Sequence, residues 1–424
     1  MSLRLAASAG AVQTLVSMAL SFLSIKITSV YLGPAGIGAL GQLAYFIALT
    51  QAVLAAGLHT GLVRRIAALR EDHNTRDRVV STVLLVLLAI GIPSALAIAV
   101  ASSWLAAKIL YDGWLDAPFL VLAAAFVFGL LAMVVTACAN GAKDFWSLAW
   151  INIGTGVSSL VLLTLLCPRF GLMGGLFATA ILPIFTAAIG VAIARRHDWW
   201  PRRPFANGFS AAEARGVVAF VPMAMVTAIG LPLLQLLIRD SVVAHSGMNA
   251  VGLLQGVMRI SDMYLGVASG IFSMYFFARF SEIREPAELV YEAGRGFLVI
   301  VPAVAVASVV IYVLRDWIVR LVFTSDFLPM RDLFGWQTFG NTLKMVGWLF
   351  GYVLLAKANA LLMAVLEGAT FVVWWLLSLH FIERDGVVGA TEAYAATYAL
   401  YALVTFAGVV LVVARMRMRA KAAA

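Results

Sequence analysis

The sequence predicts an all-α integral membrane protein of about twelve transmembrane helices, arranged as two six-helix lobes around a central cavity. The first observation is composition: of 424 residues, 63% are hydrophobic and 12% are charged, and the mean hydropathy is +0.98. A soluble domain carries roughly 25% charged residues. The second is length, because runs of the roughly 20 apolar residues that cross a bilayer recur along the chain. The third is a repeat of half the chain, described below.

The apolar runs are helical rather than strands of a barrel. Barrel strands alternate apolar and polar residues over segments of about 10 residues, whereas the run 79–100 is apolar on every face. The segment 1–9 carries one basic residue and no small-residue cleavage site, so it is interpreted as part of a retained first helix. The predicted spans are 8–31, 37–62, 79–102, 117–139, 147–166, 172–194, 215–238, 250–276, 294–314, 333–355, 360–381 and 390–413.

The distribution of Lys and Arg predicts the orientation. With the N-terminus inside, 20 of the 30 Lys and Arg residues fall on the cytoplasmic side, seven on the other side and three inside spans. The positive-inside rule therefore predicts a bacterial inner-membrane protein with both termini in the cytoplasm. The net charge of +9 then reflects loops that face anionic headgroups of the phospholipid bilayer, so no nucleic acid is expected as a partner.

An internal repeat predicts the domain organisation. Six spans is an even number, so both halves enter the membrane in the same direction. Parallel repeats of this kind are a known transporter plan, with the substrate site between the halves. We expect an N-terminal lobe over 1–205 and a C-terminal lobe over 206–424. The matched residues are Gly38, Leu40 and Arg65 with Gly252, Leu254 and Arg279 at an offset of 214, and Gly171 and Gly174 with Gly386 and Gly389 at an offset of 215.

The loops are short and none is large enough to fold into an enzyme domain. The segment RRHDWWPRRPF (195–205) places Trp199 and Trp200 beside arginines, a pattern typical of an interfacial membrane anchor. The segment Arg315–Met330 predicts a short interfacial helix on the periplasmic side. The two cysteines, Cys138 and Cys167, and the scattered histidines form no metal-site pattern, and no nucleotide-binding motif occurs. No metal, cofactor or ATP-driven step is expected.

Ionisable residues inside a span are costly and usually face a cavity or a partner. Lys344 lies near the midplane of its span and shares a stripe with Gly340, Gly347 and Gly351. The small residues permit either close helix packing or an open, hydrated groove beside the ammonium. Lys344 is accordingly either a substrate-facing cation or a member of a buried structural pair.

Three further charges lie in spans of the second half, and one in the first. Arg259 and Asp262, one turn apart, form either an intrahelical ion pair or an Arg that binds an anionic headgroup beside an Asp that binds a proton or cation. Glu367 is either a proton carrier or the partner of Lys344 or Lys357. Lys26 lies near the outer end of the first span, where it can also extend to the interface.

Several segments resemble Wzx-type polysaccharide flippases of the MOP superfamily. They are YLGPAGIGALGQL (31–43), NGAKDFWSL (140–148) and FGLMGGLFATAILP (170–183). The segments ISDMYLGVASGIFSMYFFARFSEI (260–283) and 314–358 resemble in particular the branch of the family that serves enterobacterial common antigen synthesis. The resemblance implies a flippase that moves an undecaprenyl-diphosphate-linked oligosaccharide, lipid III of that antigen or a related O-antigen unit, from the cytoplasmic to the periplasmic leaflet by alternating access.

The resemblance also implies site residues and partners. Lys344, Lys26, Lys357 and Tyr352 match substrate-binding positions, and Asp262 and Glu367 match ionisable positions suited to proton or ion coupling. Arg259 departs from the family, in which a small polar residue is expected, and is assigned to the substrate from its own position and chemistry. The partners expected are the lipid-linked glycan, a glycan polymerase and its chain-length regulator, and the protein is expected to be a monomer. The alternatives are a multidrug or cation antiporter of the same superfamily, and an integral-membrane enzyme, which would need a larger periplasmic loop.

Overall fold

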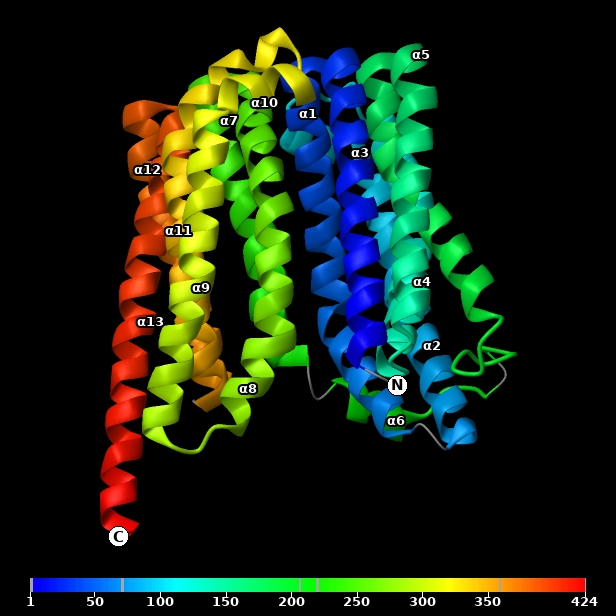
Figure 1. Cartoon of the computed structure of the whole chain (residues 1–424). Coiled ribbons are helices and arrows are strands. Elements are labelled where there is room, and N and C mark those ends of the chain that lie inside the picture. The colour runs from blue at the N-terminus through cyan, green and yellow to red at the C-terminus, as the bar shows by residue number, and fades with distance from the viewer. Residues whose placement is uncertain (1–2, 70–71, 206, 219–220, 358–359, 424) are drawn as a thin grey trace. The chain divides into compact units, whose positions relative to one another are not determined.

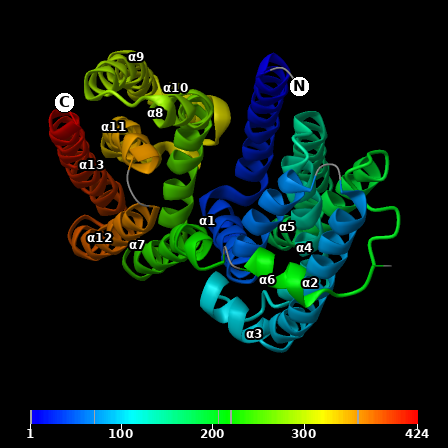
Figure 2. The same ribbon diagram turned by 90° about the horizontal axis from the view of Figure 1, so that it is seen from below.

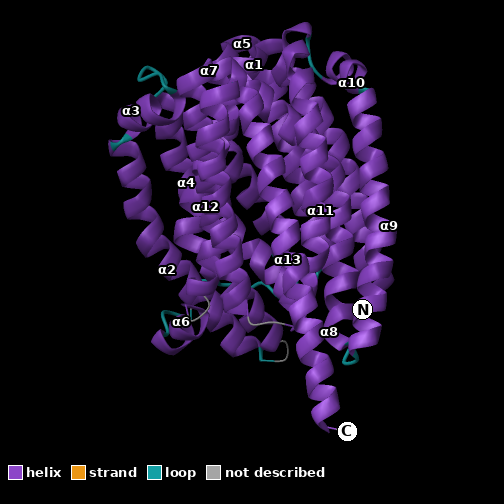
Figure 3. Cartoon of the chain, turned by 90° about the vertical axis from the view of Figure 1, so that its left-hand side faces the viewer, coloured by secondary structure: helices purple, strands orange, loops and turns teal. Residues whose placement is uncertain are grey.

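A computed structural model of the chain describes residues 3–69, 72–205, 207–218, 221–357 and 360–423. In these ranges the chain is helical nearly throughout and contains no strand, and short loops join the helices (Figure 3). The prediction of an all-α membrane protein is confirmed. Backbone contacts divide the chain into two compact units, Met1–Leu236 and Leu237–Ala424, and the chain passes from one to the other within one helix. The predicted lobe limits at 205 and 206 stay a prediction.

The first unit contains the helices up to the first part of α7. In Figure 1 they run from blue to green. Helices α3 and α6 are short, and a π-helical turn (Ala106–Leu110) follows α3. The bounds are α1 (Leu3–Ala68), α2 (His73–Val100), α3 (Ser102–Leu105), α4 (Ala117–Gly141), α5 (Phe145–Ala194), α6 (Ala211–Val218) and α7 (Val221–Ile271).

The second unit contains the rest of α7 and all later helices. Viewed from the end, α11 lies in the middle of this unit, where it packs on α9 and α13 (Figure 2). A π-helical turn (Phe272–Phe276) joins α7 to α8, and a 3₁₀ segment (Ser325–Leu333) leads into α11. The bounds are α8 (Phe277–Glu282), α9 (Pro286–Val313), α10 (Arg315–Val322), α11 (Phe334–Lys357), α12 (Ala360–Asp385) and α13 (Val387–Ala423).

Four glycines in the left-handed region join pairs of spans. Gly33 (φ 62°), Gly171 (φ 53°) and Gly247 (φ 76°) interrupt α1, α5 and α7, and Gly386 (φ 59°) separates α12 from α13. A residue with a Cβ is strained at such a φ, whereas glycine is not. The chain therefore turns at these points with almost no loop, and each long helix supplies two spans.

Counting the spans this way confirms the predicted number among the described residues. Eight described helices are long and apolar enough to cross a membrane, and three of them are the helices divided by Gly33, Gly171 and Gly247. The remaining span is α11, which has 24 residues but a lower hydropathy because polar residues such as Asn341 and Lys344 lie in it. The result is twelve spans.

The repeat is confirmed by the backbone. Gly33 and Gly247 have the same role at an offset of 214, and Gly171 and Gly386 at an offset of 215. A Cβ at Gly174 would lie 2.2 Å from the carbonyl oxygen of Leu166, and one at the matching Gly389 would lie 2.0 Å from that of Phe381. Leu166 and Phe381 are themselves 215 apart. The two halves thus repeat the same turn, including its closest backbone contact.

Two predictions about loops have different outcomes. The short helix expected after the ninth span is present as α10, with Val319 and Val322 buried and Trp317 exposed. The membrane anchor expected at Trp199 and Trp200 is wrong. These side chains are only 8% and 6% exposed and pack in the core of the first unit. The indole N–H of Trp199 donates to the carboxylate of Asp144 (3.0 Å).

Candidate substrate and ion site

The most polar interior among the described helices belongs to the second unit and centres on Asn341. This α11 side chain has no exposed surface. Its amide nitrogen donates to the hydroxyl of Ser261 (2.9 Å) and to that of Tyr264 (2.7 Å), both on α7. Its carbonyl oxygen accepts from the hydroxyl of Tyr394 on α13 (2.7 Å). Because an unsatisfied polar group inside a membrane protein costs several kcal/mol, these bonds fix the packing of three helices.

The network continues to a fourth helix. The hydroxyls of Tyr264 and Ser308, on α9, are 3.2 Å apart, and that of Thr342 donates to Ser308 (3.3 Å). The side-chain amide of Gln337, also buried on α11, donates to the side-chain carbonyl of Asn341 (3.4 Å). The hydrogen bonds therefore join α7, α9, α11 and α13 in one layer of the unit.

Lys344 lies one turn along α11 from Asn341, among aromatic rings. Its ammonium is 4.9 Å from the ring centre of Trp348, 5.3 Å from that of Tyr398 and 5.9 Å from that of Tyr394. Cation–π attraction of this kind contributes about 0.5–2 kcal/mol per favourable ring, most where water is excluded. The charge also interacts with the carboxylate of Asp262. The arrangement holds a cation inside the unit without a direct ion pair among the described residues.

The glycine stripe beside Lys344 serves close packing. A Cβ at Gly340 would lie 2.4 Å from the ring of Tyr394, and one at Gly347 would lie 2.4 Å from the ring of Tyr401. The tyrosines of α13 thus fill the space that the glycines leave. Of the two alternatives for this stripe, close packing of helices is the one present here. It also brings the rings of Tyr394 and Tyr398 to the ammonium.

Asp262 and Arg259 lie on the part of α7 that follows Gly247. Asp262 is exposed and Arg259 is half-buried. The carboxylate of Asp262 interacts with the charges of Lys344, Arg259 and Arg239, in that order of strength. The charges that the sequence singles out on α7 and α11 therefore interact with one acid, Asp262.

Glu367 lies close enough to Tyr352 and Tyr398 to interact with them, and Lys357 has a different environment. The charge of Glu367 interacts with Tyr352, Tyr398 and Tyr401. Tyr352 stacks on Phe272 with centroids 5.6 Å apart. The ammonium of Lys357 donates to the carbonyl oxygens of Ile283 and Ser281 (3.4 Å for the latter), at the C-terminal end of α8.

The alternatives for Glu367 are a proton carrier and an ion-pair partner of Lys344 or Lys357. Among the described residues, no ion pair joins Glu367 to Lys344 or to Lys357. Lys357 instead satisfies the last carbonyls of α8, which is a usual role of a Lys near a helix C-terminus. Lys26, half-buried on α1, belongs to the first unit, and its carbonyl accepts from the hydroxyl of Ser29 (2.8 Å). The other six predicted site residues belong to the second unit.

The sequence interpretation missed four residues of this interior. Asn341, Tyr394 and Tyr398 carry no charge, so a search for charges inside spans passes over them. Arg239, one of the seven basic residues expected on the side opposite the cytoplasm, has a fully buried side chain, which donates to the side-chain carbonyl of Gln255. The signal available was the tyrosine spacing on α13, where Tyr394, Tyr398 and Tyr401 share one face that matches the glycine stripe.

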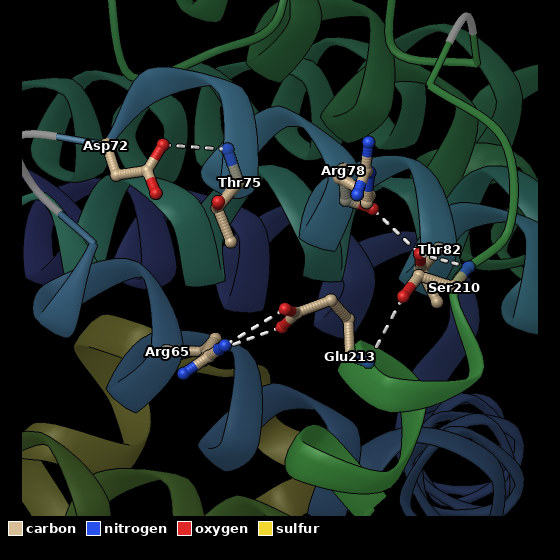
Figure 4. A network of polar contacts seen from close by, with 7 residues as sticks. All are labelled: Arg65, Asp72, Thr75, Arg78, Thr82, Ser210 and Glu213. Atoms are coloured by element: carbon tan, nitrogen blue, oxygen red, sulfur yellow. Dashed lines mark hydrogen bonds and ion pairs between the residues drawn. The ribbon is translucent and has the colours of Figure 1, made fainter.

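A second polar cluster, in the first unit, is structural. Arg65 of α1 forms two hydrogen bonds to Glu213 of α6 (2.9 and 3.0 Å), which raises the pKa of the guanidinium (Figure 4). The backbone N–H of Ser210 donates to Thr82 of α2 (3.1 Å), and the Ser210 hydroxyl accepts from the N–H of Glu213 (3.4 Å). These bonds fasten α6 to α1 and α2. The matching Arg279 of the second unit also pairs with a glutamate, Glu288 (2.6 Å).

Solved structures show the class of fold. The chain is similar to an inward-facing multidrug resistance MATE family transporter of the MOP superfamily, with a TM-score of 0.79 at 16% identity over 96% of this chain and 99% of that one. It is also similar to a MOP superfamily transporter from Pyrococcus furiosus, with a TM-score of 0.69 at 15% identity over 97% of this chain and 96% of that one. The fold is therefore that of MOP-superfamily transporters, twelve helices in two lobes.

Sequence comparison shows the family within that class. The profile of a family described as "Polysaccharide biosynthesis protein" matches residues 31–332. This is more than half of the chain, and the protein belongs to that family. The chain is also similar to proteins named lipid III flippase from Escherichia coli (strain K12) and Shigella flexneri. Each is 28% identical over 409 residues, which cover 95% of this chain and 96% of the relative.

Proposed function

We propose that this protein is a flippase, not an enzyme, which moves an undecaprenyl-diphosphate-linked oligosaccharide from the cytoplasmic to the periplasmic leaflet of the inner membrane by alternating access. The observation that carries the proposal is the similarity to lipid III flippases along 95% of the chain, within a polysaccharide biosynthesis family. The cargo is lipid III of enterobacterial common antigen or a related O-antigen unit. Both termini lie in the cytoplasm, as the distribution of Lys and Arg favours.

Lys344 is the proposed contact for the diphosphate. A diphosphate needs cations within the membrane, and Lys344 is the cation that the polar layer of the second unit holds among aromatic rings. A cation that rings hold by cation–π attraction exchanges partners at lower cost than one in a buried ion pair. Arg259, Lys26, Lys357 and Tyr352 complete the proposed substrate set.

Asp262 and Glu367 are the proposed sites of proton or ion coupling. Each is a carboxylate within a span, and each interacts with groups of the proposed substrate site: Asp262 with Lys344, and Glu367 with Tyr352. Protonation of Asp262 would leave the charge of Lys344 available to an anion. By binding a cation or a proton in turn, Asp262 would link ion binding to substrate binding.

Complementation tests the function. The chain is expressed in a strain that lacks the flippase for lipid III, and surface display of the common antigen is measured, with insertion of the protein checked by immunoblot of membranes. We expect display to be restored. A chain that is inserted but restores neither common-antigen nor O-antigen units would contradict the proposal.

The alternative is a multidrug or cation antiporter. Its only support is the similarity of the fold to MATE structures. A site for cationic drugs favours carboxylates over cations, whereas the charged groups that interact with Asp262 in the second unit, Lys344, Arg259 and Arg239, are cations. Drug-resistance profiles of the same strain separate the two. Raised resistance to cationic dyes without antigen display would favour the antiporter.

A further inference from the structure

The first unit contains a basic pocket at the end where α2 begins and α5 ends, remote in sequence from the site above. The cavity has a volume of about 1080 Å³. Two aspartates, Asp77 and Asp198, and two histidines, His73 and His197, also line it. The arginines that line it are Arg76, Arg195, Arg196, Arg202 and Arg203. The positive charge exceeds the negative charge even with both histidines neutral.

Buried contacts hold the walls of this basic pocket in place. Asp144 is the N-cap of α5. Its carboxylate accepts from the indole N–H of Trp199 (3.0 Å) and lies 3.3 Å from Nδ1 of His197. Burial raises the pKa of the Asp144 carboxyl, whereas hydrogen bonds from Ser147 and Trp199 together lower it by more. The net pKa is therefore below the ordinary value. The segment that carries Arg195–Arg203 is thereby attached to the body of the first unit.

Arg76 forms the floor and has unused capacity for hydrogen bonds. Its side chain is buried, with the residue 6% exposed. One terminal nitrogen donates to the carbonyl of Asp198 and lies 3.7 Å from the carboxylate of Asp77, whereas Nε is buried without a hydrogen-bond partner. A buried donor without a partner costs about 1–3 kcal/mol, so the guanidinium of Arg76 adds an incompletely satisfied positive charge to the lining of the pocket.

Two exposed aromatic residues follow the arginines within six positions of Arg203 in the sequence. Phe205 is 53% exposed and Phe209 is 60% exposed, on either side of Asn207, which lines the pocket. Gly208, with φ of 65°, makes the turn between them. Exposed rings beside arginines are typical of a segment that inserts into the headgroup region, where basic residues attract anionic lipids by about 1 kcal/mol each.

We infer that the basic pocket binds the phosphate headgroup of an anionic phospholipid, while Phe205 and Phe209 contact the adjoining acyl region. A guanidinium presents two parallel N–H groups that match two phosphate oxygens, and several arginines surround the cavity. The binding chemistry, a phosphate anion, is shared with soluble phosphates. The lipid is the source that the exposed rings favour. This site is separate from the proposed flippase activity and does not depend on it.

Binding to the full-length protein in neutral detergent micelles tests the inference. Native mass spectrometry measures the apparent Kd for short-chain phosphatidylglycerol, phosphatidylcholine and inorganic pyrophosphate. We expect phosphatidylglycerol to bind at least about tenfold more tightly than the other two. R202Q/R203Q should weaken it about tenfold or more, because each charged hydrogen bond contributes about 1.5 kcal/mol or more.

The controls separate this site from general charge and from soluble anions. R415Q/R417Q removes two exposed arginines from the end of α13 and should change the Kd less than about twofold. F205S/F209S should weaken binding of phosphatidylglycerol and leave that of pyrophosphate unchanged. Equal losses in the two arginine double variants would overturn the inference. Pyrophosphate binding as tight as that of the lipid would overturn the lipid assignment, and so would an unchanged Kd in F205S/F209S.

Discussion

The two halves of this protein share a backbone plan and differ in what their interiors contain. At an offset of 215, Lys344 corresponds to Gly129 and Tyr398 corresponds to Pro183. The spatial relation is kept, because a Cβ at Gly129 would lie 3.4 Å from Cβ of Pro183, while the ammonium of Lys344 lies over the ring of Tyr398. The same place in the fold holds a cation in one half and, in the other, a glycine beside Pro183 and the side-chain amide of Gln51.

The neighbouring position shows the same difference. Asn341, the centre of the hydrogen-bond network, corresponds to Phe126, which is fully buried in the apolar core of the first unit. The four turn glycines, in contrast, are retained in both halves. Backbone turns depend on φ and on close approach of main chains, so substitution is excluded there. Side chains inside a lobe have more freedom, and one half can acquire polar chemistry while the other keeps an apolar core.

The largest effect is expected from Lys344→Ala. Loss of the ammonium that lies among the aromatic rings near Asn341 should lower transport of the lipid-linked unit at least about 100-fold, or about 3 kcal/mol, in the display assay. Protein level should be unchanged. Lys108→Ala, which removes an exposed lysine of the first unit, is the matched control and should retain transport. Wild-type transport in Lys344→Ala would remove the proposed diphosphate contact.

The shared turn is tested by Gly389→Ala and Gly174→Ala. In each, the new methyl group would meet a backbone carbonyl at about 2 Å, so we expect a loss of about 3 kcal/mol in the free energy of unfolding in either half. Gly294→Ala, where a Cβ meets nothing within 4 Å, should be neutral or stabilise α9 by up to about 1 kcal/mol. Thermal unfolding followed by tryptophan fluorescence measures all three. A large effect in one half alone would contradict the equivalence of the turns.

The network itself is tested by Tyr394→Phe against Tyr398→Phe. Both variants keep the ring near Lys344, and only the first removes a hydrogen bond to Asn341. We expect about 1 kcal/mol of destabilisation for Tyr394→Phe, in the range measured for side-chain bonds in membranes. Tyr398→Phe should change the unfolding temperature by less. Equal shifts would mean that ring packing, rather than the bond to Asn341, stabilises this layer.

An effect no larger than that of Tyr394→Phe is expected from Asp144→Asn in the first unit. The pKa of Asp144 is lower in the folded protein than its ordinary value of 3.8. The charge of Asp144 therefore stabilises the fold at pH values above 3.8, and this contribution is lost as the pH falls through the folded pKa. The variant should lose about 1 kcal/mol of stability at pH 7. The difference between the two proteins should shrink as the pH falls through the folded pKa, which lies below the ordinary value of 3.8, measured by thermal unfolding in buffered detergent. A difference that is constant with pH would contradict a role for the charge.

Much of the site was predictable from the sequence, because ionisable residues are rare in spans and each one is conspicuous. Asp262, Arg259 and Lys344 were expected at the midplane of the second half, and the structure brings their charges into interaction. Asn341 and the tyrosines were not predicted. Uncharged polar residues occur in many spans, and only contacts between helices distinguish a hub from a surface residue. The predicted anchor at Trp199 and Trp200 failed for a related reason, since Asp144, a partner 55 residues away, accepts the indole N–H and keeps Trp199 inside.

The sequence by itself determined the class, the twelve spans and the repeat, because these depend on hydropathy over long windows and on glycines at fixed offsets. The bilayer requires each span to be a helix that is apolar over most of its length, and that requirement is visible in the sequence itself. Only the tertiary structure decided what surrounds each polar group: that the glycine stripe receives tyrosine rings, that Lys357 caps α8 and that Arg239 is buried. These are pairings between segments far apart in the chain, and no local pattern specifies which partner a side chain will meet.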